Sequence, residues 1–301
     1  MLGISKAIMV LMFTGGSIVQ QGDGGLDHIL APDAQMEKVA TGFQFTEGPA
    51  WGHGALFFSD IPADTIQRVT EAGEVSVFLK PSGKSNGLMF DRDGTLIACR
   101  HWERNVARIT PEGQVSVIAD TYDGKKLNSP NDCIIAADGA IYFTDPHYGL
   151  EGRPQEQDCE GVYRIAPDGK LARVVDDMTR PNGLFISPDG DTLYVADSED
   201  RKIRAYALQE DGSAGDGRDF IDMRTDAPGV PDGMTMDSEG NLYCTGGGGI
   251  WVITPEGKHL GTIAVPEVPA NCTFGAPDNS VLYITARNSI YRIALKATGL
   301  R

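Results

Sequence analysis

The segment 181–197 reads P-N-G-L-F-I-S-P-D-G-D-T-L-Y-V-A-D, and its pattern recurs along the whole chain. A short polar motif opens it, an apolar run follows, and a second apolar run returns after Asp189 and Gly190. An Asp-Gly pair between two apolar runs is a strong signal for a tight β-hairpin. The segment therefore predicts two antiparallel strands, with Asn182 at the start of the first.

The polar motif occurs six times, at the spacing of roughly 40 to 50 residues that is typical of β-propellers. Its copies are T-E-G-P (46–49), S-N-G-L (85–88), P-N-D-C (130–133), P-N-G-L (181–184), P-D-G-M (231–234) and A-N-C-T (270–273). A second strand follows each copy, at 54–60, 94–100, 139–145, 191–197, 240–246 and 280–286. A third follows at 66–69, 106–109, 162–165, 203–206, 250–253 and 290–293.

A fourth strand is visible in several repeats, at 75–79, 115–118 and 171–175. Six such units predict an all-β fold, a six-bladed β-propeller with four-stranded blades. The last repeat lacks an outer strand after Ile293, whereas a strand-like segment at 36–41 precedes the first repeat. We expect this N-terminal strand to join the last blade, because an unpaired edge would invite aggregation.

We expect one propeller domain over residues 26–301, preceded by a leader over residues 1–25. The leader carries an apolar run at 7–13 and small residues at 14–17. That run is too short to span a bilayer, and it resembles a weak secretion signal. The pattern favours export slightly, and a disordered cytoplasmic leader stays open as the alternative.

The charge balance limits the possible partners. The chain has 42 acidic and 26 basic residues, a formal net charge of −16, which repels nucleic-acid backbones and anionic membranes. Its five cysteines are widely spaced and lack the Cys/His grouping of a structural zinc site. We expect a small-molecule ligand, no nucleic acid or membrane, and a monomer or weak dimer.

The six motifs place oxygen-bearing side chains at one mouth of the propeller, since every inner strand starts near the same face. These side chains are Glu47, Asn86, Asn131, Asn182, Asp232 and Asn271. Any one of them is explained by turn formation alone. Two carboxylates among four carboxamides, all in register, favour instead a ring that binds a hard cation, and calcium takes six to eight oxygen ligands.

The ends of the second strands should surround the same mouth and line a polar pocket. They carry Asp60, Arg100, His101, Asp145, His147, Asp197 and Arg287. For Asp60 and Asp197 the preferred interpretation is a hydrogen-bonded loop aspartate, because such residues are common at strand ends. His101 and His147 either line the pocket or pack against neighbouring strands.

Taken together, these segments resemble the family of senescence marker protein, gluconolactonases and luciferin-regenerating enzymes, which includes regucalcin. The resemblance covers about residues 35 to 295 and is strongest to bacterial gluconolactonases. It rests on T-E-G-P-A-W, L-N-S-P-N-D, Y-F-T-D-P-H-Y-G-L, R-P-N-G-L, D-G-M-T-M-D and N-C-T-F-G.

The resemblance implies a propeller that holds one divalent metal ion, calcium first and zinc, magnesium or manganese as alternatives. Its ligands would be Glu47, Asn182 and Asp232, with Asn131 touching metal or substrate. Asp232 would act as the base, and Asp145 is a rival because drug-responsive lactonases of the group have an aspartate there. Beside Asn131, the positions of the ring and of the pocket rim lead us to expect substrate contacts from Arg100, His101, His147, Asn86 and Asn271.

The chain departs from the family pattern at Ser129, where regucalcin-like members carry an arginine. Their sugar contacts are therefore not transferred to this chain. The sequence predicts a metal-dependent hydrolase that opens a small sugar-type lactone. Another lactonase, a phosphotriesterase on the same scaffold and a calcium- or ligand-binding propeller without activity remain as alternatives, because a fold does not determine function. No G-x-S-x-G motif supports a serine hydrolase.

Overall fold

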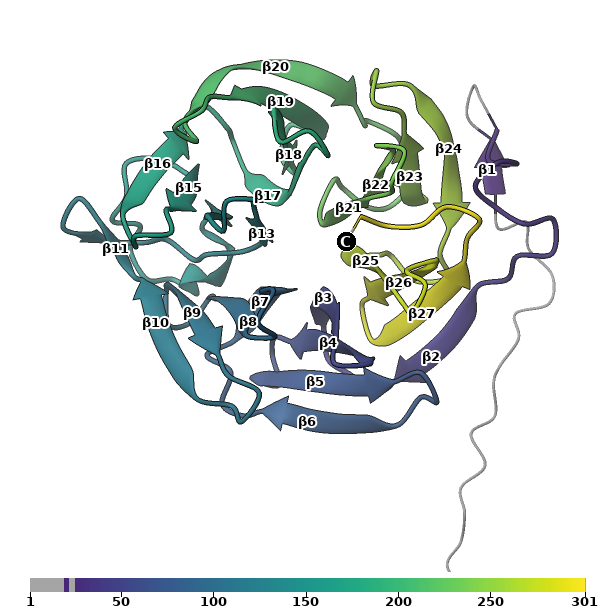
Figure 1. Ribbon diagram of the computed structural model, residues 1–301, viewed down its shortest axis with the longest axis horizontal. Coiled ribbons are helices and arrows are strands. Elements are labelled where there is room, and N and C mark those ends of the chain that lie inside the picture. The colour runs from purple at the N-terminus through teal and green to yellow at the C-terminus, as the bar shows by residue number, and fades with distance from the viewer. Residues whose placement is uncertain (1–18, 22–24, 301) are drawn as a thin grey trace, which may run out of the picture.

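A computed structural model describes residues 19–21 and 25–300 of the chain. Six small antiparallel sheets stand around a central axis in the order of the sequence (Figure 1). The described residues form β-strands, turns and one 3-10 helix, η1 (Tyr148–Leu150). The prediction of a six-bladed β-propeller is therefore confirmed. Apart from residues 19–21 and 25, the predicted leader lies outside the described residues.

Each of the first four blades is a run of four consecutive strands, numbered from the axis outward. Blade 1 contains β3 (Thr46–Gly52), β4 (Ala55–Asp60), β5 (Thr65–Thr70) and β6 (Val75–Leu79). Blade 2 contains β7 (Ser85–Phe90), β8 (Leu96–Arg100), β9 (Asn105–Ile109) and β10 (Val115–Ala119). Blade 3 contains β13 (Cys133–Ile135), β14 (Ile141–Asp145), β15 (Gly161–Ile165) and β16 (Leu171–Val175). Blade 4 contains β17 (Pro181–Ile186), β18 (Thr192–Asp197), β19 (Lys202–Leu208) and β20 (Ala214–Asp222).

The last two blades recruit strands from the N-terminal part of the chain. Blade 6 contains β25 (Asn271–Gly275), β26 (Val281–Ala286) and β27 (Ser289–Ala294), and β2 (Glu37–Thr41) pairs with β27 as its outer strand. This confirms the predicted closure of the ring. Blade 5 contains β21 (Met234–Met236), β22 (Leu242–Gly246), β23 (Gly249–Ile253) and β24 (His259–Ala264). A further strand, β1 (Val19–Gln21), pairs with β24 (Figure 1), and the sequence did not predict it.

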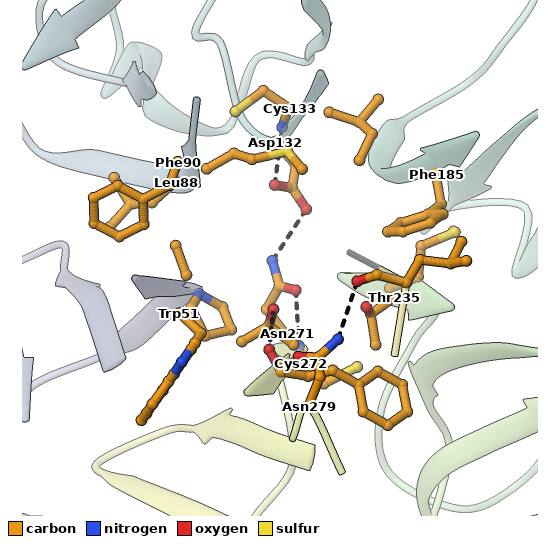
Figure 2. A pocket seen from close by; sticks show the side chains of 18 of the residues that line it. Trp51, Leu88, Phe90, Asp132, Cys133, Phe185, Thr235, Asn271, Cys272 and Asn279 are labelled. Carbon is orange, nitrogen blue, oxygen red and sulfur yellow. Dashed lines mark hydrogen bonds between the residues drawn. The ribbon is translucent and has the colours of Figure 1, made fainter. Parts of the chain in front are cut away.

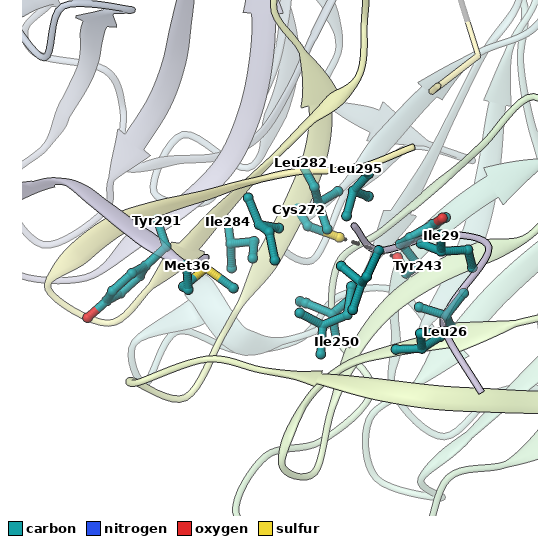
Figure 3. Packing of buried hydrophobic residues seen from close by; sticks show 14 of the residues in the cluster. Leu26, Ile29, Met36, Tyr243, Ile250, Cys272, Leu282, Ile284, Tyr291 and Leu295 are labelled. Carbon is teal, nitrogen blue, oxygen red and sulfur yellow. Dashed lines mark hydrogen bonds between the residues drawn. The ribbon is translucent and has the colours of Figure 1, made fainter. Parts of the chain in front are cut away.

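The core lies between neighbouring blades, where apolar faces of adjacent sheets pack together. In the largest cluster, Tyr243 and Ile250 of blade 5 pack with Ile284 and Tyr291 of blade 6. Residues Leu26, Ile29 and Met36, which precede β2, fill the same space (Figure 3). The N-terminal segment thus contributes apolar side chains as well as an edge strand to the last interface.

Between β10 and blade 3, the chain forms a two-stranded ribbon of β11 (Thr121–Tyr122) and β12 (Lys125–Lys126). The five cysteines are free, and Cys99, Cys133, Cys244 and Cys272 are buried. No helix in the described part of the chain is long and apolar enough to cross a membrane.

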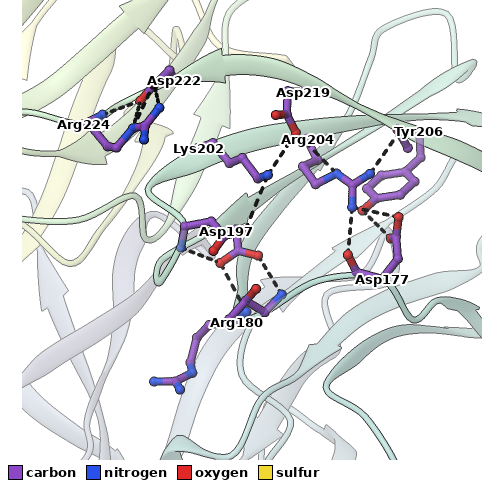
Figure 4. Close-up of polar contacts among 12 residues, drawn as sticks. Asp177, Arg180, Asp197, Lys202, Arg204, Tyr206, Asp219, Asp222 and Arg224 are labelled. Atoms are coloured by element: carbon purple, nitrogen blue, oxygen red, sulfur yellow. Dashed lines mark hydrogen bonds and ion pairs between the residues drawn. The ribbon is translucent and has the colours of Figure 1, made fainter.

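Polar side chains cross-link the outer strands of the blades. In blade 4, Arg204 on β19 pairs with Asp177 at 2.7 Å, and Tyr206 donates to the same aspartate at 2.9 Å (Figure 4). Lys202 pairs with Asp219 on β20 at 3.1 Å. Such exposed or half-exposed pairs contribute little to stability, about 0–1 kcal/mol each. They position the outer strands, while the packed faces stabilise the blade.

Candidate active site

The six motif residues lie at or just before the start of the inner strands, so they meet at one mouth of the central channel. All are buried except Asp232, which is partly exposed and lines a cavity of about 540 Å³. The other walls of this mouth cavity come from blades 1, 4, 5 and 6 and include Phe45, Arg201, Asp226 and Arg287. The six side chains therefore converge as the sequence predicts, and Asp232 connects them to a cavity of ligand size.

Hydrogen bonds link the ring residues across blade boundaries. Asn86 donates from Nδ2 to Oδ1 of Asn131 at 2.8 Å. Asn271 lies beside Glu47 and Asn182 lies beside Asp232, and each carboxamide partly offsets the raised pKa of its carboxyl neighbour. These contacts fix the carboxamides in defined orientations and bring the two carboxylates into one polar cluster.

Glycine follows the ring residue in four of the six motifs because neighbouring inner strands touch there. A Cβ on Gly48 would lie 1.9 Å from the carbonyl oxygen of Asn86, and one on Gly183 would lie 2.2 Å from that of Asp232. A Cβ on Gly233 would lie 1.8 Å from the Asn271 carboxamide. The motif therefore combines an oxygen-bearing side chain with a residue small enough for close approach.

Asp132 occupies this small-residue position in blade 3 and places a third carboxylate in the channel. It is 8 % exposed, accepts from Asn271 Nδ2 at 3.0 Å and accepts from its neighbour Cys133 N at 2.9 Å. Sequence reasoning missed it. The available signal was its place in the motif P-N-D-C, where four other repeats have glycine.

Burial raises the pKa of all three carboxylates, and neighbouring carboxylates add to this effect for Glu47 and Asp232. Burial, and then repulsion from Asp132, raises the pKa of Glu47. Burial, followed by the charges of Glu47 and Asp132, raises the pKa of Asp232 well above its usual range. Burial raises the pKa of Asp132 to about 7. Concentrated negative charge of this kind is stabilised when a cation binds.

The ring residues fit a hard divalent cation. Within residues 19–21 and 25–300, no three His, Cys, Asp or Glu side chains are grouped so that they alone hold a metal ion. The fit therefore depends on the carboxamide oxygens of Asn131 and Asn182 together with Glu47 and Asp232. Oxygen donors with two carboxylates match the preference of calcium, whereas zinc prefers nitrogen and sulfur.

Tyr148 on η1 joins the site, and sequence reasoning missed it. Its hydroxyl lies beside Ser198 and Asn182, which partly offset the effect of burial, and burial raises the pKa of Tyr148 to about 12. Ser198 in turn accepts from Asn182 Nδ2 at 3.0 Å and donates to the Pro231 carbonyl at 2.6 Å. The ring of Tyr148 is half-exposed, with the Arg180 guanidinium 5.4 Å from its centroid. Tyr148 thus connects the ring to the rim of the mouth.

The predicted rim residues have different surroundings. His101 is buried beside Asn86, with Nε2 3.4 Å from the Asn86 amide, and burial lowers its pKa to about 4. His147 pairs with Glu160 on the surface and is partly exposed. Arg100 donates to the Ser82 carbonyl at 2.8 Å and to Asn105, so its guanidinium is engaged in hydrogen bonds within blade 2 and the segment before it.

Asp145 ends the second strand of its blade and accepts a hydrogen bond from a backbone N–H, an arrangement that recurs in three blades. Its Oδ2 accepts from the backbone N of Asn128 at 2.7 Å, and the residue is fully buried. At the same position, Asp60 accepts from Phe45 N at 3.0 Å. Asp197 accepts from Thr179 N at 2.8 Å (Figure 4). Each aspartate fastens the segment that leads into an inner strand, as predicted for Asp60 and Asp197.

Comparison with known proteins agrees with this architecture. Residues 45–288 match the model of the SMP-30/Gluconolactonase/LRE-like region. A gluconolactonase of Zymomonas mobilis is 36% identical, over 91% of this chain and 85% of that protein. A pentonolactonase of Haloferax volcanii is 28% identical, over 82% of this chain and 83% of that protein.

A solved gluconolactonase of Xanthomonas campestris superposes with a TM-score of 0.89 at 33% identity, covering 97% of this chain and 99% of that one. The match extends over the strands that carry all six ring residues. The chain belongs to the SMP-30/gluconolactonase/LRE-like family.

Proposed function

We propose that this protein is a divalent-metal-dependent hydrolase that opens a small sugar-type lactone. The observation that carries the proposal is that Glu47 and Asp232 lie together at one mouth of the channel. The charged groups that act on these two carboxylates are themselves carboxylates, so a cation is the missing counter-charge. Related proteins named gluconolactonase and pentonolactonase support lactones as the substrate class.

In this proposal Glu47, Asn131, Asn182 and Asp232 hold the ion, with calcium preferred and zinc, magnesium or manganese as alternatives. When bound, a divalent cation supplies positive charge where the lactone carbonyl oxygen becomes negative during attack by water. The mouth cavity positions the lactone over the ring.

Asp232 is the residue that we assign as the base. It combines a raised pKa with partial exposure to the mouth cavity, so it is able to contact a water molecule beside a bound substrate. Burial also raises the pKa of Asp145, to about 7. The Asp145 carboxylate, however, is fully buried and accepts a hydrogen bond from the backbone N–H of Asn128, which favours a structural role.

Tyr148, Arg201 and Arg287 provide polar groups for the hydroxyls of a sugar lactone. Tyr148 contacts the ring through Asn182, whereas both arginines line the mouth cavity. An unbranched acyl chain offers no hydroxyl groups to hydrogen-bond with these side chains. Small polyhydroxylated lactones are therefore favoured over acyl-homoserine lactones.

The experiment is a substrate screen with the metal varied. Glucono- and pentonolactones, acyl-homoserine lactones and organophosphate triesters are compared after chelation and after addition of calcium, magnesium, manganese or zinc. The proposal expects the highest kcat/KM for a sugar lactone in calcium. Faster turnover of the triesters would assign a phosphotriesterase, and metal binding without turnover of any substrate would assign a binding protein.

A further inference from the structure

A second cavity occupies the channel on the far side of the ring. It has a volume of about 430 Å³ and is lined by the residues that follow the ring position in all six inner strands. Because each inner strand starts at the ring and runs away from it, this lower cavity opens at the opposite mouth. The mouth cavity described above and the lower cavity thus meet opposite sides of one polar layer.

The walls of the lower cavity are mostly apolar and contain four aromatic side chains. They include Trp51, Leu88, Phe90, Phe185, Met234 and Phe274 (Figure 2). A segment near the C-terminal end of the described chain forms part of the far rim. There Leu300 lines the cavity and donates its N–H to the Met236 carbonyl at 3.2 Å. An apolar cavity of this size is typical of small-molecule sites.

The floor of the lower cavity is polar and anionic. Asp132 and Asn271 form it, joined by their 3.0 Å hydrogen bond across the channel (Figure 2). Among the described residues that line the cavity, none is a lysine or an arginine. Asp132 is the carboxylate of the channel that lines this cavity, since neither Glu47 nor Asp232 does.

We propose that the lower cavity binds a small organic ammonium ion, with its amine on Asp132 and its apolar body against the aromatic walls. A carboxylate at the end of an apolar cavity forms a charge-assisted hydrogen bond with an ammonium group. Aromatic walls add cation–π attraction. A bare metal ion suits the cavity less well, because it requires several oxygen ligands and the walls supply few.

The test uses three ligands of nearly equal shape, titrated calorimetrically into the calcium-loaded full chain. They are 2-phenylethylamine, neutral 2-phenylethanol and anionic phenylacetate. We expect the amine to bind about tenfold more tightly than the alcohol, since a hydrogen bond between charged groups is stronger than one to a neutral hydroxyl. Phenylacetate should bind most weakly. Equal affinities for the three ligands would overturn the proposal.

Three variants locate the site. Asp132→Asn should remove the preference for the amine and leave the affinity for the alcohol unchanged. Thr273→Trp, which fills the cavity at its far side, should abolish binding of both ligands. Tyr148→Phe, at the opposite mouth, should bind the amine like the parent protein. The proposal is wrong if Tyr148→Phe loses the amine or if Thr273→Trp retains it.

The Thr273→Trp result also decides the matter if Asp132→Asn proves too unstable to titrate. None of these measurements depends on lactone turnover. A protein that hydrolyses lactones without binding the amine contradicts the ammonium site alone, whereas the reverse result contradicts only the proposed hydrolase.

Discussion

Asn271 of blade 6 donates from Nδ2 to Oδ2 of Asp132 of blade 3 at 3.0 Å, although 139 residues separate them in sequence. Asn271 also lies beside Glu47 of blade 1, so the bridge from Asn271 to Asp132 stands next to a second carboxylate. This bridge separates the predicted metal ring from the lower cavity. It also couples the geometry of the ring to blades 1, 3 and 6.

The first prediction distinguishes the two candidate bases. Asp232→Asn keeps an oxygen at the ring but removes a charge and the base, so calcium affinity should fall. We expect kcat to drop by about 10²-fold or more even at saturating calcium. Asp145→Asn, the matched control, should retain calcium affinity and lose mainly stability. Steady-state kinetics at several calcium concentrations check both variants, and near-normal kcat for Asp232→Asn would move the base elsewhere.

Tyr148→Phe tests the residue that the sequence did not reveal. The change removes a hydroxyl that touches Ser198 and Asn182 while keeping the ring beneath Arg180. We expect kcat/KM for a sugar lactone to fall by about tenfold, the value of one hydrogen bond, with calcium affinity unchanged. Tyr194→Phe, in the core between blades 4 and 5, serves as the control. Unchanged kcat/KM in Tyr148→Phe would exclude a substrate contact.

Gly233→Ala tests the packing at the axis. The new methyl group would meet the Asn271 carboxamide, which is held by Asp132 and by the backbone of Cys272. We expect a loss of about 1–3 kcal/mol in stability and weaker calcium binding, because crowding displaces a fixed side chain. Gly215→Ala, whose nearest neighbours would lie 3.6 Å away, is the matched control. Equal melting temperatures and calcium affinities for the two variants would contradict this account.

Without metal, stability should depend on pH. Burial raises the pKa of Asp132 from 3.8 to about 7, so the unfolded chain releases this proton at lower pH than the folded chain. The metal-free protein therefore loses stability as pH rises from about 4 to about 7. Melting temperatures with chelator should fall over this range, and Asp132→Asn should flatten the curve. A melting temperature that rises with pH over this range, and no longer rises in Asp132→Asn, would contradict the prediction.

Much of the fold was predictable because its pattern is local and repeated. Hairpin turns such as Asp189-Gly190 and the sixfold motif indicate the blades directly, and the missing outer strand after Ile293 indicates how the ring closes. The pairing of β1 with β24 was not predictable, since three residues carry no period. A strand this short forms because the unpaired edge of β24 offers it hydrogen-bonding partners.

The ring was predictable and its surroundings were not. Glu47 and Asp232 share a repeat position, so sequence alone brings them to one mouth. Asp132 was overlooked because its neighbour Asn131 fills the motif position. Only the packing of the glycines shows that the residue after each ring residue also lies at the axis, against the neighbouring inner strand. Tyr148 reaches Asn182 from the loop after β14, a contact that no periodicity encodes.

The most direct test of the central claim is calcium binding and lactone hydrolysis measured together on the parent protein and Glu47→Gln. Glu47→Gln preserves the shape of the side chain and removes one ring charge. The account predicts that the chelated parent protein is inactive, regains activity with one calcium per chain and melts at higher temperature when loaded. It predicts that Glu47→Gln binds calcium more weakly and loses activity in parallel. Full hydrolysis by a verified metal-free parent protein, or unchanged calcium affinity in Glu47→Gln, would contradict it.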